Sequence, residues 1–304
     1  MKTVSVITPC YNDGDYIRDA VNSVRAQTYP DIELIIIDDG SDDEATIREI
    51  RTLAEETGVT VIQTDHMGPS GARNAGIAVA KGEYILPLDA DDIIEPTYIE
   101  KAAAVLDGNE KVGVVYCHAD LFGNRNGDWG LSEYSLYAML ADNVVFVTSL
   151  FRKADWEAVG GFRTSMEHGM EDYDFWLSLL EIGREIVQLP ETLFHYRIKS
   201  TSRTTKFLQD KNVVKETYRD IYRQHPALYA QYRDMYAMAL RDTLVDQIFG
   251  NRAMVEELRR QLAEAQTAYA VISDAFFWKL TKPLRVLTDA LKRILQRVRR
   301  KMGR

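Results

Sequence analysis

Three short clusters of acidic, amide and hydroxyl residues hold the side chains that could do chemistry in this sequence. They span residues 8–13 (T-P-C-Y-N-D), 38–41 (D-D-G-S) and 89–92 (D-A-D-D), and each stands where an apolar run ends. Carboxylates gathered at one place repel one another unless a cation neutralises them, and their hard oxygen atoms favour Mg²⁺ or Mn²⁺. Such ions also bind substrate phosphates. The clusters therefore predict a site for a divalent ion and a phosphate-bearing ligand.

Aspartates also occur in solvated turns and at the starts of helices, where they accept hydrogen bonds from backbone N–H groups. We expect this ordinary role for Asp42 and Asp43, which precede a helical pattern. Asp89 and Asp91 directly follow a buried apolar run, and we expect them to bind the metal ion.

Residues 67–76 (M-G-P-S-G-A-R-N-A-G) form a loop that runs into a helical pattern rich in small residues. Small residues permit close approach of a ligand to the backbone, and a helix N-terminus favours phosphate. Arg73, in the first turn, could reach a diphosphate, although by itself it would be interpreted as part of a surface ion pair. The sequence has neither G-x-G-x-x-G nor G-x-x-x-x-G-K-[ST], which weighs against dinucleotide-binding and P-loop proteins.

The elements that must position these residues alternate between short apolar runs and amphipathic patterns, as is typical of βαβ units with a mostly parallel sheet. The expected strands are 4–8, 33–37, 59–63, 84–88 and 112–117, with helices at 15–26, 44–56, 70–80 and 96–106. Farther along we expect a helix at 171–182 and strands at 185–189 and 193–197. Ligands of open α/β sheets bind beyond the carboxyl ends of the strands, where the three clusters stand.

Five segments in order resemble the family 2 glycosyltransferases of the GT-A fold, over roughly residues 3–200. They are S-V-I-T-P-C-Y-N, I-I-I-D-D-G-S-D-D, G-P-S-G-A-R-N-A-G-I, G-E-Y-I-L-P-L-D-A-D-D and M-E-D-Y-D-F-W. The resemblance implies a Rossmann-like α/β fold with helices around the sheet. It also implies inverting transfer of a sugar from a nucleoside diphosphate donor, expected to be a UDP-sugar, to a glycan or lipid-linked acceptor of cell-surface glycan biosynthesis.

The resemblance also implies roles for single residues. Pro9 and Tyr11 would line the pocket of the base, Asp39 would accept a hydrogen bond from it, and Arg73 would contact ribose or diphosphate. Asp89 and Asp91 would form the D-x-D motif that holds Mn²⁺ or Mg²⁺, with Asp91 favoured as the direct ligand. The expected donor-binding residues are Pro9, Tyr11, Asp13, Asp39, Arg73, Asp89, Ala90 and Lys199.

Asp172 would be the catalytic base by the same resemblance, with Glu171 as the alternative. Both lie in the first turn of the expected helix at 171–182, whose dipole should keep a carboxylate ionised and able to take a proton from an acceptor hydroxyl. Without the resemblance, favourable charge at a helix start would explain them. Many relatives carry a histidine near the position of Lys199, and a lysine there could bind phosphate; we expect His195 to be structural.

Composition limits the remaining classes. The net charge of −9 argues against a general nucleic-acid binder. Cys10 and Cys117 have no metal-like or redox-like spacing, so we expect a reducing compartment. No apolar stretch is long enough to span a membrane, and the N-terminal apolar run is too short for a signal peptide. We therefore expect a cytoplasmic protein.

The expected domains are 1–205 for donor binding and catalysis, 206–275 as a helical extension, and 276–304 as a basic tail. Apolar residues spaced by three and four give the extension a short heptad seam, which favours a packed helix and a self-associating coiled coil about equally. The seam comprises Val255, Leu258, Leu262, Ala265, Tyr269, Ile272 and Phe276.

Residues 279–304 hold ten of the 37 basic side chains and one of the 46 acidic ones, a net +9, so the rest of the chain carries 27 − 45 = −18. Their apolar and basic faces predict an interfacial helix on anionic lipid at the inner face of the cell membrane, or a helix docked on the acidic body.

A noncatalytic sugar-nucleotide-binding or scaffold protein at the membrane is the alternative function of the chain. An aspartate-based phosphatase fits less well, because its D-x-D motif would follow the first strand.

Overall fold

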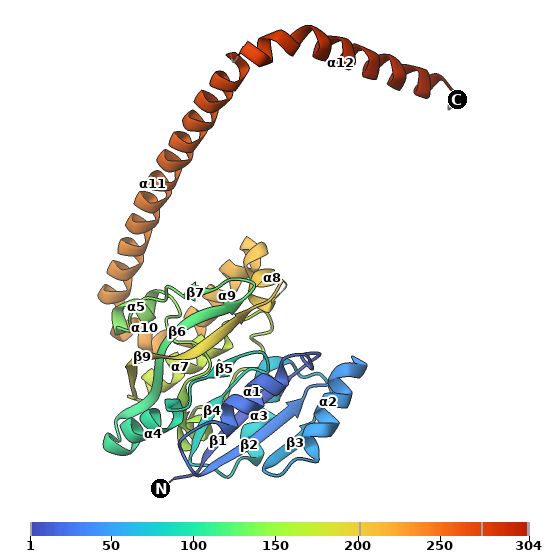
Figure 1. Cartoon of the computed structure of the whole chain (residues 1–304). Coiled ribbons are helices and arrows are strands. Elements are labelled where there is room, and N and C mark those ends of the chain that lie inside the picture. Colours follow the sequence, from blue (N-terminus) through green and yellow to red (C-terminus); the bar gives the residue numbers. More distant parts are fainter. Residues whose placement is uncertain (1, 201, 275, 303–304) are drawn as a thin grey trace. The chain divides into compact units, whose positions relative to one another are not determined.

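The computed structural model describes residues 2–200, 202–274 and 276–302 (Figure 1). The chain forms two compact units, Met1–Leu240 and Arg241–Arg304. The first unit holds the sheet together with the helices α8 to α10, so it extends past residue 205, where we expected the first domain to end. Its core is one cluster of buried apolar residues.

A single sheet organises the first unit, in the order β3-β2-β1-β4-β8-β6-β9-β5, with β7 paired to β6. Strands β3, β2, β1 and β4 are parallel, and so are β6 and β9, whereas β5, β7 and β8 pair antiparallel to their neighbours. The strands are β1 (Val4–Cys10), β2 (Ile32–Asp38), β3 (Val59–Gln63), β4 (Tyr84–Pro87), β5 (Ile93–Ile94), β6 (Val112–Gly123), β7 (Gly127–Asp128), β8 (Leu150–Arg152) and β9 (Glu185–Ile198).

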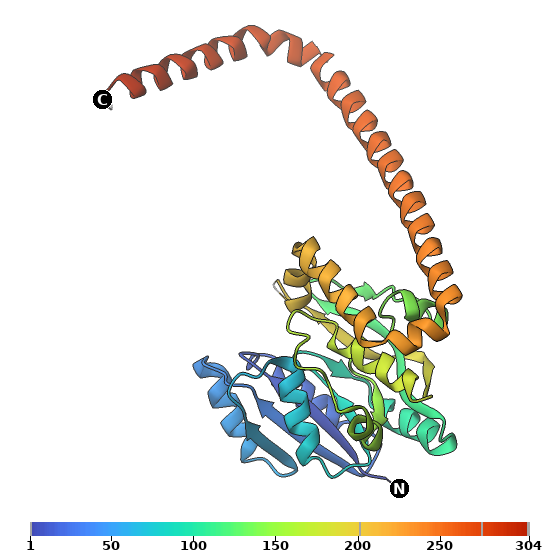
Figure 2. The same ribbon diagram turned by 180° about the vertical axis from the view of Figure 1, so that it is seen from behind.

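Helices cover both faces of this sheet. Helix α1 lies in front of the strands in Figure 1 and α3 lies in front of them in the view from behind in Figure 2. Because both faces are covered, the middle of β2 is a continuous buried run, Ile35, Ile36 and Ile37, instead of an alternating one. The helices of the first unit are α1 (Ile17–Arg25), α2 (Glu44–Ala54), α3 (Gly68–Val79), α4 (Tyr98–Gly108), α5 (Leu136–Ala141), α6 (Lys153–Val159), α7 (Glu171–Glu181), α8 (Arg203–Gln209), α9 (Lys211–Gln224) and α10 (Pro226–Gln231).

The expected strands at 185–189 and 193–197 are one strand, β9. Proline has no N–H to donate to a ladder, and Pro190 lies between the two expected strands. The structure instead shifts register there: Gln188 pairs with Tyr116, but Thr192 pairs with His118. The extra residues on β9 form an irregularity that accommodates the proline within a continuous strand.

Helices α9 and α10 are fixed to α7 by a buried histidine. The ring of His225 is fully buried; Nε2 lies 3.1 Å from Oδ1 of Asp174 and Nδ1 lies 3.1 Å from Oε2 of Glu181, both on α7. Asp174 also accepts a hydrogen bond from Nε of Arg163 at 2.8 Å. These contacts explain why the helices after residue 205 belong to the first unit.

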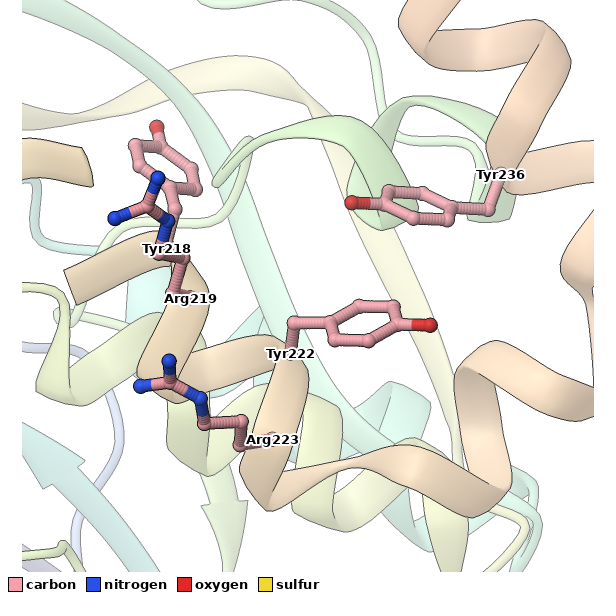
Figure 3. Close-up of a pocket in the computed structure, with 5 residues that line it drawn as sticks. All are labelled: Tyr218, Arg219, Tyr222, Arg223 and Tyr236. Carbon is pink, nitrogen blue, oxygen red and sulfur yellow. The ribbon is translucent and has the colours of Figure 1, made fainter. Parts of the chain in front are cut away.

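A shallow hollow of about 580 Å³ lies over α9 and the start of α11 (Arg233–Asp274), lined by tyrosines and arginines (Figure 3). The rings of Tyr222 and Tyr236 stack with centroids 6.0 Å apart. Arg219 and Arg223 already pair with acidic residues of α9 itself. The hollow is therefore a surface feature of the helical packing, and we assign it no chemistry.

The second unit comprises most of α11 and α12 (Phe276–Met302). The expected seam residues from Val255 to Tyr269 lie on α11, whereas the side chains of Ile272 and Phe276 lie outside those described. On α12, large apolar side chains from Leu284 to Leu295 are more than half exposed. None of the described helices combines the length and the apolar character that a membrane-spanning segment requires.

Candidate active site

Arg73 joins two acidic segments, the turn after β4 and the start of α7. Its guanidinium donates from Nη2 to Oδ1 of Asp89 at 2.6 Å and from Nη1 to Oε1 of Glu171 at 2.7 Å. Arg73 is only 3% exposed, so these bonds form largely out of water. A second cation, Arg203, donates to the same Oε1 of Glu171 at 2.9 Å. The residues after β4 and at the start of α7 thus share one buried ion network.

The cluster after β4 meets a second cation, Lys199. Its Nζ lies 2.8 Å from Oδ2 of Asp91 and 2.6 Å from Oδ1 of Asp13, which follows β1. Burial alone would lower the pKa of the Lys199 ammonium, but the two carboxylates outweigh it and hold the pKa above its usual value. Burial, with the nearby charge of Asp89, raises the pKa of Asp91 despite this ammonium. Lys199 thus lies between Asp13, which we expected to bind the donor, and Asp91, which we expected to bind the metal ion.

Asp92 and Arg197 fix the backbone around this cluster. The fully buried Asp92 accepts a hydrogen bond from the backbone N–H of Arg197 at 2.8 Å, and Nε of Arg197 donates to the carbonyl oxygen of Asp91 at 2.7 Å. Burial raises the pKa of Asp92, as do the charges of Asp91 and Asp89. Strand β9, which carries Arg197, therefore holds the turn after β4 in place.

Asp39 organises the loop that leads into α3. Its Oδ1 accepts from the backbone N–H of Met67 at 2.7 Å and from Oγ1 of Thr64 at 2.7 Å, and its Oδ2 accepts from the N–H of Gly68 at 2.9 Å. These N–H groups stand at the start of α3, where we expected phosphate to bind, so the carboxylate of Asp39 occupies that position. Contact between Asp39 and a nucleobase stays a prediction.

Tyr11, Pro9 and Ala90 differ in exposure. The half-exposed ring of Tyr11 packs beside the ring of His66, with centroids 4.1 Å apart. Pro9 is partly buried near the end of β1, and Ala90 is buried in the turn after β4. Tyr11 and His66 are the aromatic pair that a flat base could stack against.

Glu171 and Asp172 are neighbours in α7 but lie in different electrostatic surroundings. Burial would raise the pKa of Glu171, but Arg73 and Arg203 outweigh it and hold the pKa below its usual value. Burial and the charge of Glu171 raise the pKa of Asp172 to about 7. Desolvation and the neighbouring carboxylate therefore act against the helix dipole, which we expected to keep Asp172 ionised.

Asp172 also keeps the more open position of the two. It is partly exposed; its Oδ1 accepts a hydrogen bond from the adjacent N–H of Tyr173 at 2.8 Å, and its carboxyl group also bonds to the side chain of Asn143. Glu171 is 5% exposed and already pairs with two guanidinium groups. Glu171 is thus enclosed by its two guanidinium partners, whereas Asp172 is the less enclosed carboxylate of the two.

The acidic residues fit a divalent ion only together with a phosphate ligand. No three His, Cys, Asp or Glu side chains within the described parts of the chain are placed to hold a metal by themselves. Asp89 gives one oxygen to Arg73 and Asp91 one to Lys199, so each carboxylate retains a second oxygen. Two carboxylate oxygens plus substrate phosphates are a usual set for Mg²⁺.

The other residues noted in the sequence have ordinary roles. Asp43 is the N-cap of α2 and accepts from the N–H of Thr46 at 2.8 Å, as predicted. His195 lies between Asp120 and Glu95, at 2.5 and 2.9 Å. Both cysteines are buried free thiols, and burial raises the pKa of each to about 12, which makes them poor nucleophiles.

Sequence analysis missed three residues of this site: His66, Asn143 and Arg203. Arg203 comes 32 residues after its partner Glu171, and Asn143 comes 29 residues before Asp172. No local periodicity signals such contacts. His66 directly precedes the small-residue loop at 67–76, and its place there is the one signal that could have drawn attention to it.

Comparison with known proteins decides the family. The model of glycosyl transferase family 2 matches residues 5–164, more than half of the chain. The chain belongs to glycosyl transferase family 2. It is 35% identical over 216 residues to glycosyltransferase GlyG of Streptococcus pneumoniae, covering 66% of this chain and 72% of GlyG. An uncharacterized glycosyltransferase of Rickettsia prowazekii is 29% identical over 231 residues, 72% of this chain and 70% of its own.

Solved structures give the same fold for this family 2 glycosyltransferase. Staphylococcus aureus TarS residues 1–349 in complex with UDP superposes with a TM-score of 0.61 at 20% identity, covering 80% of this chain and 71% of that one. The complex of TarS with UDP-GlcNAc gives 0.60 at 21% identity, covering 73% and 66%. The expected GT-A fold is thereby confirmed.

Proposed function

We propose that this glycosyltransferase moves a sugar from a UDP-sugar to a hydroxyl of a glycan or lipid-linked acceptor, with inversion, in cell-surface glycan biosynthesis. The UDP and UDP-GlcNAc complexes of TarS support a nucleotide-sugar donor. The observation that carries the proposal is the buried network in which Arg73 joins Asp89, beside the expected donor site, to Glu171, beside Asp172. Charge-binding and proton-accepting groups are thereby held together by one side chain.

Asp172 is the proposed catalytic base. In its ionised form it takes the proton of the acceptor hydroxyl while that oxygen attacks the anomeric carbon and the bond from sugar to diphosphate breaks. Glu171 cannot take this role as readily, because Arg73 and Arg203 hold its negative charge. A single displacement of this kind needs no covalent nucleophile, in agreement with the buried, unreactive cysteines.

Lys199 and the Asp89–Asp92 turn are the proposed binding site of the diphosphate. Asp91, with Asp89, would hold Mn²⁺ or Mg²⁺, which would neutralise charge on the departing diphosphate. The ammonium of Lys199 lies against Asp91 and supplies a fixed positive charge at the same place. Tyr11 and His66 would flank the base, and Asp39 would act by holding the loop beside them.

We also propose that the chain is peripheral on the inner face of the cell membrane and self-associates through α11. The exposed apolar side chains and the basic residues of α12, Lys292, Arg293 and Arg297 among them, support attachment to anionic lipid, where lipid-linked acceptors lie.

The experiment that tests the enzymatic proposal is UDP release from a panel of UDP-sugars, with Mn²⁺ and an extract of lipid-linked glycans as acceptor. Acceptor-stimulated release that Asp172→Asn removes supports the transferase. A chain that binds UDP-sugars but never releases UDP, in any combination, would be the noncatalytic scaffold.

A further inference from the structure

The heptad seam of α11 is longer than the stretch noticed in the sequence. Reading backward from Val255 in steps of three and four residues adds Asn251, Ile248 and Leu244, all on the same helix. The described seam therefore runs from Leu244 to Tyr269, about 39 Å of helix at 1.5 Å per residue. The constant average spacing of 3.5 residues, instead of 3.6, is the period of a left-handed coiled coil.

Among the described residues of the second unit, the leucines of this seam are largely exposed. The side chains of Leu244, Leu258 and Leu262 are 56%, 57% and 59% exposed. Long helices in water are stabilised mainly by packing of an apolar face against another element. The leucine-rich seam of α11 is exposed to solvent along the helix. It therefore requires a partner surface whose apolar residues repeat with the same heptad spacing. A second copy of α11 is a surface with that period.

We propose that this segment pairs with a second copy of the chain as a parallel, in-register, two-stranded coiled coil. The proposal deepens the self-association already proposed, because it assigns the number of strands, their direction and the residues in contact. In the heptad frame, position a holds Ile248, Val255, Leu262 and Tyr269, and position d holds Leu244, Asn251, Leu258 and Ala265.

The residue types at these positions support two strands. Two of the four a positions hold β-branched residues, Ile248 and Val255, and two of the four d positions hold leucine; β-branched residues at a with leucine at d favour parallel dimers. Asn251 is a single polar residue in an apolar seam. Its amide finds a hydrogen-bonding partner when it meets a second Asn251, so it favours the in-register arrangement.

The charges beside the seam support the parallel direction. Positions e include Arg252 and Arg259, and the facing g positions of a parallel partner hold the uncharged residues Gln247 and Met254. In an antiparallel pair, e faces e, so arginines would approach arginines and repel one another. The pairs of Arg260 with Glu257 and Glu264 lie on the outer face of the helix and leave the seam free.

A parallel pair brings two α12 helices to the same end of the coil. If each α12 binds anionic lipid weakly, as proposed above, two linked helices bind more tightly than either does alone. Membrane attachment would then depend on the seam as well as on the tail.

Cysteine cross-linking of the full chain tests strand direction. Leu244→Cys and Leu258→Cys, made as separate variants, stand 14 residues or about 21 Å apart along the helix. A parallel in-register pair lets both variants form a disulfide-linked dimer on mild oxidation. An antiparallel pair brings identical residues together at one point only, so at most one variant links. Glu256→Cys, on the outer face, is the matched control that should not link, and the native cysteines are buried.

Sedimentation equilibrium of the unmodified chain gives the number of strands. A mass of two chains that falls to one in Leu258→Asp is the expected result. A monomer, a trimer, or links from only one of the two cysteine variants would overturn the proposal. UDP binding, measured by calorimetry on the same samples, reports the donor site separately: a monomer that binds UDP refutes only the coil, and a dimer that binds no nucleotide refutes only the proposed donor.

Discussion

The ammonium of Lys199 lies 2.8 Å from a carboxylate oxygen of Asp91, at the turn where the sequence predicts a metal ion. The same ammonium holds Asp13 at 2.6 Å, so it draws together residues that follow β1 and β4. A fixed cation at this place lets the carboxylates lie close together before a diphosphate or metal ion arrives. Lys199 is thus a structural element of the proposed donor site as well as a candidate ligand of the phosphates.

Replacing Lys199 with Met should weaken UDP binding by about tenfold or more, since a hydrogen bond to a charged group contributes about 1.5–3 kcal/mol. The carboxylates of Asp13 and Asp91 would lose their shared partner and repel the diphosphate as well. Isothermal calorimetry with UDP measures the change. Lys199→Arg, which keeps the charge, should retain most of the affinity, and equal losses in both variants would contradict a role through charge.

Asp172→Asn should bind UDP normally but lower the rate of transfer by about 10²–10⁴-fold, the usual contribution of a general base. The amide preserves the shape of the side chain but cannot take the proton of the acceptor. Calorimetry with UDP and single-turnover transfer separate the two effects.

Glu171→Gln is the matched comparison for Asp172→Asn, because it changes the adjacent carboxylate in the same helix turn. It should reduce stability, since Arg73 and Arg203 would lose a buried anionic partner, and the loss of such a partner costs about 3 kcal/mol or more. A near-normal transfer rate in Asp172→Asn, with a large loss in stably folded Glu171→Gln, would assign the base to Glu171.

The pH profile follows from the raised pKa of Asp172, about 7. Below this value the carboxyl is mostly protonated and cannot act as a base, so kcat/KM should rise with pH and level off above about 7.

The stability of the folded protein should change with pH in the opposite direction to its activity. A carboxyl whose folded pKa exceeds its unfolded pKa binds more protons when folded, so its contribution to stability falls as pH rises toward 7. Asp172→Asn should therefore unfold at a higher temperature than the unmodified chain at pH 8, and a lower one would contradict this assignment.

Asp91→Ala should remove the binding of Mn²⁺ in the presence of UDP, because the favoured carboxylate ligand is lost. Electron paramagnetic resonance counts free Mn²⁺ in such a titration. Asp42→Ala is the control, since Asp42 is an exposed aspartate that bonds to Asn12 and should leave Mn²⁺ binding unchanged. Unchanged binding in Asp91→Ala would exclude it as a ligand.

The main elements of this fold could be predicted because their signals are local. The apolar runs predicted the bounds of β1 to β4 to within a few residues. The acidic clusters follow the ends of these strands in the structure, as predicted. Strand β8 was missed because three residues, Leu150–Arg152, carry no measurable alternation, and they lie in an apolar run that fits several structures.

The electrostatics of the site could not be predicted, because they depend on contacts between distant residues. The sequence alone placed Glu171 and Asp172 in one helix turn, where the helix dipole should act on both carboxylates equally. The structure separates them, since Arg73 comes from α3 and Arg203 from the segment after β9, and both reach Glu171. Burial of Asp172 is likewise a property of the packed protein, which no spacing of residues reveals.

Deleting residues 276–304 should release the protein from vesicles that contain anionic lipid, because the basic residues and the exposed apolar face of α12 are removed together. Changing Lys292, Arg293 and Arg297 to Gln keeps the apolar face and should weaken binding by about 1 kcal/mol for each charge. Co-sedimentation with vesicles of anionic and of neutral lipid measures both variants. If the tail instead docks on the acidic body of the protein, neither variant changes partitioning. In that case the acidic excess of residues 1–278, and not lipid, is what the basic helix recognises.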